Sequence, residues 1–278
     1  MISFDSGSFH KTRDGGIYLK YEEIEGLTEE LLLDYDKTLL INPRAIEYDD
    51  FLEGYLGVNL LYEDIYTPDS DNVILGCSVF NRQNIAIFDK ENMCKSYVSC
   101  EPRTVIIDNA VVTGNRQIQE NITGLHEGGH IWMHSEQFTQ IEGQLAVDCY
   151  SGAICCRKSD IYIDNRIGTF RPGNAEMWRE WQANVFAVTI ALPKKSLDIS
   201  INDLFKKYGV DTDALIVDMD YGAKRLAEQT IPEELRSIYN MSKESIKYRL
   251  EKTGFYKTKK KYEEEHSNIQ MSLFDFIK

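Results

Sequence analysis

A chain of 278 residues, 42% hydrophobic and 11% aromatic, is long enough to bury a sizeable core, as one domain with a subdomain or as two small domains. Its formal net charge of -14 argues against a protein that coats nucleic acid over its whole surface. No stretch approaches the roughly 18 uninterrupted apolar residues of a membrane span, so we expect none.

The first residues, MISFDSGSFHKTRDGG, lack the basic and then apolar pattern of a signal peptide. Without such a signal, cysteines in a long chain are more typical of free thiols than of disulfides. We therefore expect a cytoplasmic protein whose six cysteines are reduced: Cys77, Cys94, Cys100, Cys149, Cys155 and Cys156.

The predicted elements begin with a helix after a polar first segment. We expect it from Asn42 onward, because Ile46, Phe51 and Tyr55 lie near helical spacing and Gly57 stands just past its end. Four short segments rich in Val, Ile and aromatic residues follow, each bounded by Asn, Asp or Gly. We expect them to be strands of a small sheet: VNLLYE (58–63), NVILGCSVF (72–80), QNIAIF (83–88) and RTVIIDN (103–109).

Two longer helices are predicted next. The first covers about 115–134, and residues 135–173 form a long excursion after it. The second follows Asn174, a residue type that caps helices, and its run AEMWREWQANVFAVTIAL is stopped by Pro193. Further helical segments extend to about Gly254, before a charged linker, KTKKKYEEEHSN, and the terminal IQMSLFDFIK.

The first long helix contains GLHEGGHIWMH, in which His126, Glu127 and His130 stand in the order H-E-x-x-H. Residues four apart share one face of a helix, so the two imidazoles can bind one metal ion. A catalytic zinc site has three protein ligands and an open position for water. Glu127 is placed to act as a general base toward that water. Two histidines on an ordinary helix are the alternative.

The third ligand must come from another part of the chain. His134 lies about 12 Å along the helix axis from His126, too far for both to bind one ion. The other two histidines stand near the ends of the chain, so we expect a carboxylate or a cysteine. Glu180 on the second helix is the candidate, and a solvent-facing glutamate is the alternative. Asn184, four residues on, can accept the N–H of a ligand histidine and fix its tautomer.

Three further residues of the first helix call for a structural explanation. Gly128 and Gly129 each cost about 1 kcal/mol relative to alanine within a helix. We expect another backbone to approach them closely beside the metal. His134 is expected to be a packing histidine near the end of the helix.

Together, LHEGGHIWMH and EWQANVFAVTIALP resemble the ImmA/IrrE family of zinc-dependent metallopeptidases. That family reads roughly H-E-L-G-H-x-x-x-H, followed by E-x-x-A-N/D-x-F-A-x-x-L-L-x-P. The resemblance covers about residues 45–255. The matching positions are His126, Glu127, Gly129, His130 and His134 in the first motif, and Glu180, Ala183, Asn184, Phe186, Ala187, Leu192 and Pro193 in the second.

The resemblance implies an α+β, zincin-like fold, with a small mixed sheet beside the metal helix. It also implies a cytosolic, gluzincin-like endopeptidase that binds one Zn²⁺ per chain through His126, His130 and Glu180, with Glu127 as the base. The best-known members of the family cleave helix-turn-helix repressors, which switches on genes of mobile elements or of a stress response. The expected parts are an N-terminal extension (1–41), the metallopeptidase domain (42–193), a helical, helix-turn-helix-like subdomain (194–256) and a charged linker with a tail motif (257–278).

Two departures from the family pattern concern the metal helix and the insert. Gly128 stands where the family has a bulky residue, and 49 residues separate the two motifs, counted between the second histidine and the glutamate. The insert contains Cys149, Cys155 and Cys156 and could form a lid or a substrate surface. A second metal site there is less favoured, because C-x5-C-C is not a recognised zinc spacing.

The C-terminal region is basic. From 222 to 261 there are eleven Lys and Arg residues against five Glu, on an otherwise acidic chain. SIYNMSKESIKYRLEK predicts two helices joined by a turn, with Lys243, Lys247 and Arg249 on the second. Such cations can contact DNA phosphates, although we favour a helical packing module. A DNA-associated transcriptional regulator with a structural metal site is therefore the alternative function.

The terminal segment contains QMSLF, which resembles the short peptide by which bacterial replication proteins bind the sliding clamp. Gln270 would anchor one end, and Leu273 and Phe274 would fill an apolar pocket. The same apolar residues could instead fold back onto the domain.

Overall fold

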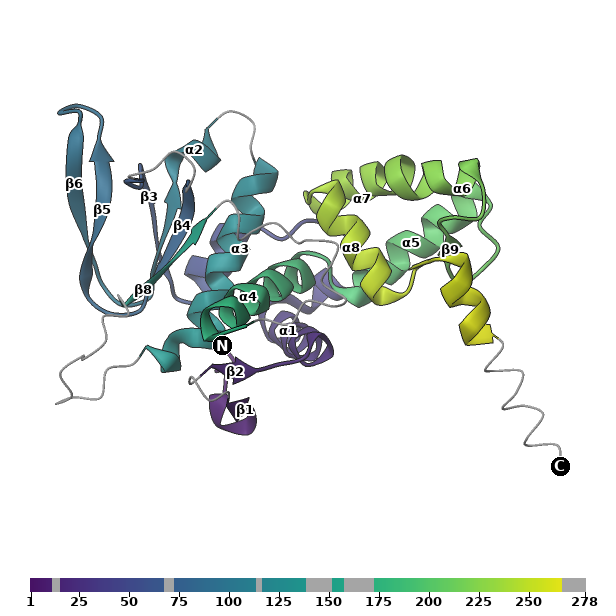
Figure 1. The fold of residues 1–278 in the computed structure, drawn as a ribbon, viewed down its shortest axis with the longest axis horizontal. Helices are drawn as coiled ribbons and strands as arrows, with labels where there is room; N and C mark the ends of the chain where they lie inside the picture. The colour runs from purple at the N-terminus through teal and green to yellow at the C-terminus, as the bar shows by residue number, and fades with distance from the viewer. Residues whose placement is uncertain (12–15, 68–72, 114–116, 139–151, 158–172, 267–278) are drawn as a thin grey trace.

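The computed structural model describes residues 1–11, 16–67, 73–113, 117–138, 152–157 and 173–266. Within them the protein is of mixed α and β structure, with small sheets. Figure 1 shows the larger sheet and a β-hairpin at one end of the molecule, two helices, α3 and α4, in the middle, and α5 to α8 at the other end.

The larger sheet has four strands in the order β3-β7-β4-β8. β3 is parallel to β7, whereas β4 is antiparallel to both of its neighbours. β5 and β6 form a separate antiparallel hairpin. The strands are β3 (Asn59–Glu63), β4 (Ile74–Val79), β5 (Gln83–Asp89), β6 (Cys94–Cys100), β7 (Thr104–Asp108) and β8 (Ala153–Arg157).

Each of the four predicted strand segments contains a strand, but β6 and β8 were not predicted. β6 reads CKSYVSC and is mostly exposed or half-buried, so it lacks the apolar alternation that indicates a strand. β8 is a five-residue strand, AICCR, inside the long excursion between the motifs. Its place in the sheet depends on pairing with β4, a long-range contact that local sequence does not encode.

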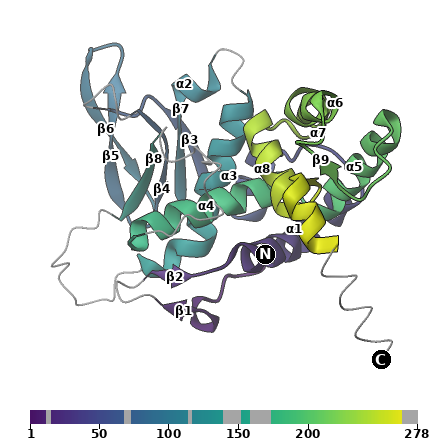
Figure 2. The ribbon, with the colours of Figure 1, turned by 45° about the vertical axis from the view of Figure 1, so that its right-hand side comes forward.

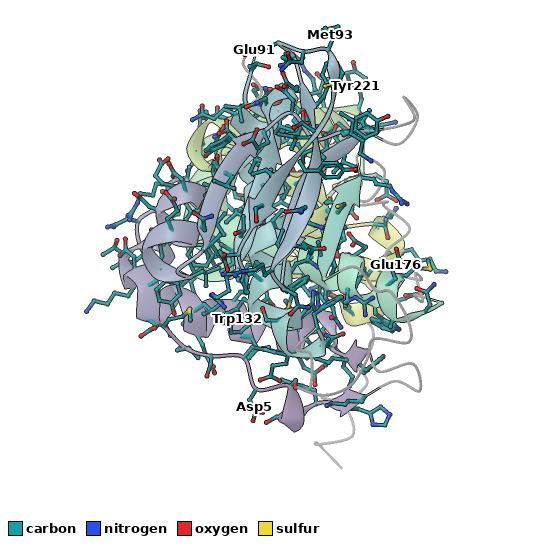
Figure 3. All side chains as sticks on the ribbon, turned by 90° about the vertical axis from the view of Figure 1, so that its left-hand side faces the viewer. Asp5, Glu91, Met93, Trp132, Glu176 and Tyr221 are labelled. Carbon is teal, nitrogen blue, oxygen red and sulfur yellow. The ribbon has the colours of Figure 1, made fainter. Side chains whose placement is uncertain are left out.

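Alternate residues of β4 face opposite sides of the larger sheet, as the pleat of a strand requires. Gly76 and Ser78 lie against Glu127 of α3. Cys77 and Val79 belong to a separate buried cluster that includes Ile85 and Cys100 of the hairpin. The hairpin thus covers the face of the sheet opposite α3; in Figure 3 its turn is marked by Glu91 and Met93.

The two long helices are present as predicted. α3 covers Gln117–His134, and all its residues from Asn121 to His134 are buried. α4 covers Ala175–Ala191, and the Asn174 side chain caps it by accepting a hydrogen bond from Met177 N at 2.8 Å. α3 lies between the sheet and α4 (Figure 1).

The first predicted helix is shorter than expected. Residues 43–47 form no regular element, and helical structure begins at Tyr48 and continues as a π-helix from Asp50 to Tyr55. Asn42 precedes Pro43, and a residue before proline is disfavoured in helical backbone angles, so the helix cannot begin there. Gly57 does follow the end of the helix, at a φ of 64° that suits glycine.

The segment expected to be an N-terminal extension contributes to the core. It contains α1 (Tyr21–Asp36), which buries Ile24, Leu31 and Leu32 and packs along α4. These apolar residues are spaced for one helical face among many glutamates. The many glutamates of the segment make this apolar spacing hard to detect in the sequence.

The C-terminal helices dock onto α1 and α4 (Figure 2). They are α5 (Lys194–Tyr208), α6 (Tyr221–Arg225), α7 (Ile231–Tyr239) and α8 (Lys243–Thr253). Arg249 of α8 is fully buried, and its Nη1 donates to the Tyr21 hydroxyl at 2.6 Å and pairs with Glu25 at 2.5 Å. Its Nε donates to the carbonyl oxygen of Leu192 at 2.9 Å. One side chain thus joins α8 to α1 and to the end of α4.

Two sequence predictions concern the rest of the chain. Gln270, Leu273 and Phe274 of the tail motif lie outside the described residues. Among the residues that are described, no helix combines the length and the apolar character needed to cross a membrane.

Arg249→Met should lower the free energy of unfolding by about 3 kcal/mol, because it removes one partner of a buried ion pair and leaves the others unpaired. Arg225→Met is the matched control, since Arg225 is exposed on α6 and should change stability by less than about 0.5 kcal/mol. Urea unfolding followed by circular dichroism measures both. Equal midpoints for the two variants would contradict the anchoring role of Arg249.

Candidate metal centre

α3 presents His126 and His130 on one face, toward α4, and both side chains are fully buried. The adjacent glycines allow other groups to pack closely on α3, but these groups are not the backbone that the sequence predicted. A Cβ on Gly128 would lie 2.5 Å from Leu52 Cδ2, and one on Gly129 would lie 3.0 Å from Phe186 Cδ1. Side chains, rather than the expected backbone, therefore approach the metal helix closely.

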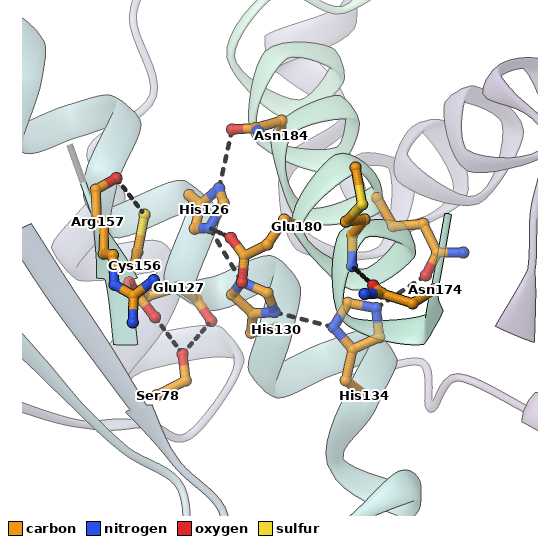
Figure 4. A network of polar contacts seen from close by, with 12 residues as sticks. Ser78, His126, Glu127, His130, His134, Cys156, Arg157, Asn174, Glu180 and Asn184 are labelled. Atoms are coloured by element: carbon orange, nitrogen blue, oxygen red, sulfur yellow. Dashed lines mark hydrogen bonds and ion pairs between the residues drawn. The ribbon is translucent and has the colours of Figure 1, made fainter. Parts of the chain in front are cut away.

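Donor atoms of three side chains from the two helices converge at one point (Figure 4). The Nε2 atoms of His126 and His130 are 2.9 Å apart. Glu180 of α4 places Oε2 at 3.2 Å from the first nitrogen and Oε1 at 3.5 Å from the second. The structure thus brings together the three side chains that the sequence nominates as metal ligands.

Asn184 fixes the tautomer of His126. Its Oδ1 lies 3.0 Å from His126 Nδ1, and because a carbonyl oxygen can only accept, Nδ1 must carry the proton. The neutral His126 ring then directs the lone pair of Nε2 toward Glu180. Asn184 therefore occupies the position beside the ligand histidine that the sequence assigned to it.

A longer relay fixes the tautomer of His130. Gln182 donates from Nε2 to the carbonyl oxygen of Ile17 at 2.6 Å, so its Oε1 faces His134 Nε2 at 2.9 Å and accepts from it. The remaining nitrogen of His134, Nδ1, must then accept from His130 Nδ1, 3.0 Å away. His130 Nε2 is left with a lone pair directed at Glu180.

The geometry of these donors fits a zinc ion. Ligand distances of about 2.0–2.1 Å in a tetrahedral site place the donor atoms about 3.3 Å from one another. The observed separations of 2.9, 3.2 and 3.5 Å bracket that value. Glu180 Oε2 is also buried and accepts no hydrogen bond from a described residue. Two imidazole nitrogens and one carboxylate form a donor set that suits zinc.

The electrostatics of the cluster favour a positive charge at its centre. Burial opposes charging of His126, but Glu180 outweighs it and raises the pKa of that imidazole. Burial also opposes ionisation of Glu180, yet the neighbouring His130 and His126 hold the pKa of its carboxyl below the ordinary range. Burial lowers the pKa of His130 and of His134, so these two rings stay neutral, as metal binding requires of a ligand.

Glu127 faces the sheet beside this cluster. Ser78 Oγ donates to its Oε2 at 2.5 Å, while its Oε1 is buried with no hydrogen-bond partner among the described residues. A Cβ at Gly76 would lie 2.6 Å from that oxygen, so the glycine is required for the carboxyl to sit there. Burial raises the pKa of Glu127 to about 8, within the range useful for proton transfer near neutral pH.

The two cysteines of β8 point to opposite faces of the sheet. Cys156 is fully buried, and its Sγ lies within 4.8 Å of donor atoms of both His126 and Glu180. Cys155 Sγ instead donates to Cys77 Sγ at 3.1 Å. These thiols do not converge, and Cys149 lies outside the described residues. None of the five described cysteines is joined in a disulfide.

Sequence reasoning missed four residues of this centre. His134 was expected only to pack, although its position four residues after His130 already placed it on the same helical face. Gly76 carried a detectable signal, since glycine within a strand indicates close approach of another group. Ser78 and Gln182 had no local signal, because each acquires its role through contacts distant in sequence.

Comparisons with known proteins add no family assignment. No protein-family model matches the chain. No curated protein matches it significantly either.

His134→Phe should weaken zinc binding roughly 10–100-fold, because it leaves Nδ1 of the ligand His130 without its partner. His266→Phe makes the same exchange at an exposed histidine and should leave the affinity unchanged. Competition with a chromophoric chelator measures the affinity of each variant. Circular dichroism of the metal-free proteins checks that both remain folded, and wild-type affinity in folded His134→Phe would contradict the relay.

Proposed function

We propose that the protein is a zinc-dependent endopeptidase of the zincin type, as its resemblance to the ImmA/IrrE family implies. The observation that carries the proposal is the convergence of His126, His130 and Glu180 on one buried point, with Glu127 beside it. The H-E-x-x-H spacing accounts for two of these ligands. The third comes from a separate helix, with 49 residues between it and His130.

Each of the four side chains has a role in peptide hydrolysis. His126, His130 and Glu180 hold the ion, which supplies Lewis acidity toward a peptide carbonyl and an attacking water. Glu127 takes the proton from the water through Oε1 and then passes it to the leaving amine. Ser78 donates to the other carboxylate oxygen and so leaves Oε1 without a hydrogen bond from a described residue.

Glu127 buries a carboxyl oxygen that has no hydrogen-bond partner among the described residues. This burial supports a catalytic centre over a purely structural metal site. A buried carboxyl oxygen without a partner is costly to the fold. In this protein Gly76 and Ser78 nevertheless hold Glu127 in that environment. A site that only stabilised the fold would need the three ligands and not this fourth group.

The substrate class follows from the resemblance alone. The proposed substrate is a specific cytosolic protein, in the first place a helix-turn-helix repressor, whose cleavage would induce mobile-element or stress-response genes. β8 lies at one end of the order of the described strands, and its Cys156 lies beside the centre.

The alternative is a DNA-associated regulator that uses the basic C-terminal helices. Of the three cations on α8 that suggested it, Arg249 is buried in contacts with α1 and α4. Lys243 pairs with Glu233 at 2.6 Å. These contacts favour a packing role for α8. Salt-dependent binding of duplex DNA by the intact chain, undiminished in Glu127→Gln, would support the regulator instead.

The ligand and base assignments predict opposite phenotypes for two glutamate substitutions. Glu180→Ala should lose zinc, because it removes one of three ligands. Glu127→Gln should retain about one zinc per chain but lose proteolysis by at least about 100-fold, since the amide cannot take a proton. Glu120→Gln, on the same helix and away from the ligands, is the matched control and should retain both properties.

Elemental analysis gives the metal content, and labelling of new protein N-termini in expressing cells gives the cleavage. The proposal expects new N-termini with wild type and Glu120→Gln, and none with Glu127→Gln. Zinc retained by Glu180→Ala would show that the third ligand is another residue. Identical N-termini in wild type and Glu127→Gln would overturn the endopeptidase.

A further inference from the structure

We propose that Cys156 is a fourth ligand of this metal centre and that its thiolate closes the site in a latent form of the enzyme. The inference rests on the proposed metal site, and it concerns the position that a catalytic centre leaves open for water. Four protein ligands make a zinc site structurally closed, whereas three leave it competent for hydrolysis.

The position of the sulfur carries the inference. Sγ of Cys156 and one donor atom each of His126 and Glu180 all lie within 4.8 Å of one another. A Zn–S distance of about 2.3 Å would place the sulfur about 3.5 Å from its fellow ligands. A movement of about 1 Å, within the reach of a side-chain rotation, therefore brings the sulfur to ligand distance from the His126 and Glu180 donor atoms.

Sheet pairing determines which cysteine faces the metal. Cys156 is paired with Gly76 of β4, and Cys155 with Cys77. Paired residues project from the same face of a sheet, so Cys156 shares the face of Gly76, which contacts Glu127. Because Gly76 has no side chain, the Glu127 carboxyl occupies the space above it, on the same face of the sheet as Cys156.

One hydrogen bond of the thiol is weak enough to exchange. Cys156 Sγ lies 3.6 Å from the carbonyl oxygen of Arg157, a contact in which the S–H is a poor donor. The thiol is also buried beside the His126 imidazole and the Glu180 carboxylate. As a metal ligand it would neutralise part of the ion's charge within the same dry interior.

Ligation by Cys156 would replace a water molecule with a thiolate at the metal. The S–H bond breaks, its proton passes to solvent, a sulfur–metal bond forms and one water molecule leaves. With that water absent, Glu127 has no proton to take, and the centre does not hydrolyse peptides. β8 lies at one end of the order of the described strands, where it pairs with β4.

Cobalt substitution distinguishes this arrangement directly, because only a thiolate ligand gives Co²⁺ an intense near-ultraviolet sulfur-to-metal charge-transfer band. The experiment uses the full-length protein loaded with Co²⁺ alone, as wild type, Cys156→Ala and Cys155→Ala. We expect the band in wild type and in Cys155→Ala, and its loss in Cys156→Ala. We also expect zinc to bind Cys156→Ala at least tenfold more weakly.

The outcomes separate this inference from the endopeptidase proposal. Co²⁺ bound by wild type without the band, or a band unchanged in Cys156→Ala, overturns thiolate ligation, whether or not Glu127-dependent cleavage is seen. The band with its predicted dependence on Cys156 upholds ligation. Cleavage that rises at least tenfold in Cys156→Ala upholds latency, and cleavage equal to wild type overturns it.

Discussion

The structure around α3 and α4 depends on the burial of three electron-pair donors at one point. Each of His126, His130 and Glu180 would cost free energy if brought there alone, because none has a proton donor facing it from the others. Their placement is tolerable when a positive charge occupies the space between them. The surrounding hydrogen bonds keep the lone pairs of the donors directed at one another. The spacing of the donor atoms fits a metal ion between them.

The protonation state of the centre is determined far from the metal. Asn184 holds one imidazole, whereas the other depends on His134, Gln182 and finally the backbone of Ile17. Ile17 precedes α1, and Arg249 of α8 donates a hydrogen bond to Tyr21 of the same helix. The N-terminal segment is thus coupled both to the metal ligands and to the C-terminal helices, and it belongs to the folding unit that forms the site.

Local sequence patterns predicted the elements that carry their own signals. Caps, periodicity and terminators were enough for α3, α4 and four of the strands, and the H-E-x-x-H spacing nominated two ligands. What could not be predicted arises from pairing across the chain. β8 and Cys156 face the centre only because β8 pairs with β4, and the role of Ser78 exists only because Gly76 admits Glu127. The π-helix from Asp50 to Tyr55 likewise places Leu52 against Gly128, a contact distant in sequence.

The two cysteines of β8 show how one strand can combine a structural and a chemical role. Cys155 is exposed and donates to Cys77, which belongs to the buried cluster on the face covered by the hairpin. Cys156, one residue on, faces a cluster of metal-binding groups. The difference between them is the alternation of the strand, and a one-residue change of register against β4 would exchange their positions. The register of β8 against β4, rather than composition, therefore decides which of the two thiols lies beside His126 and Glu180.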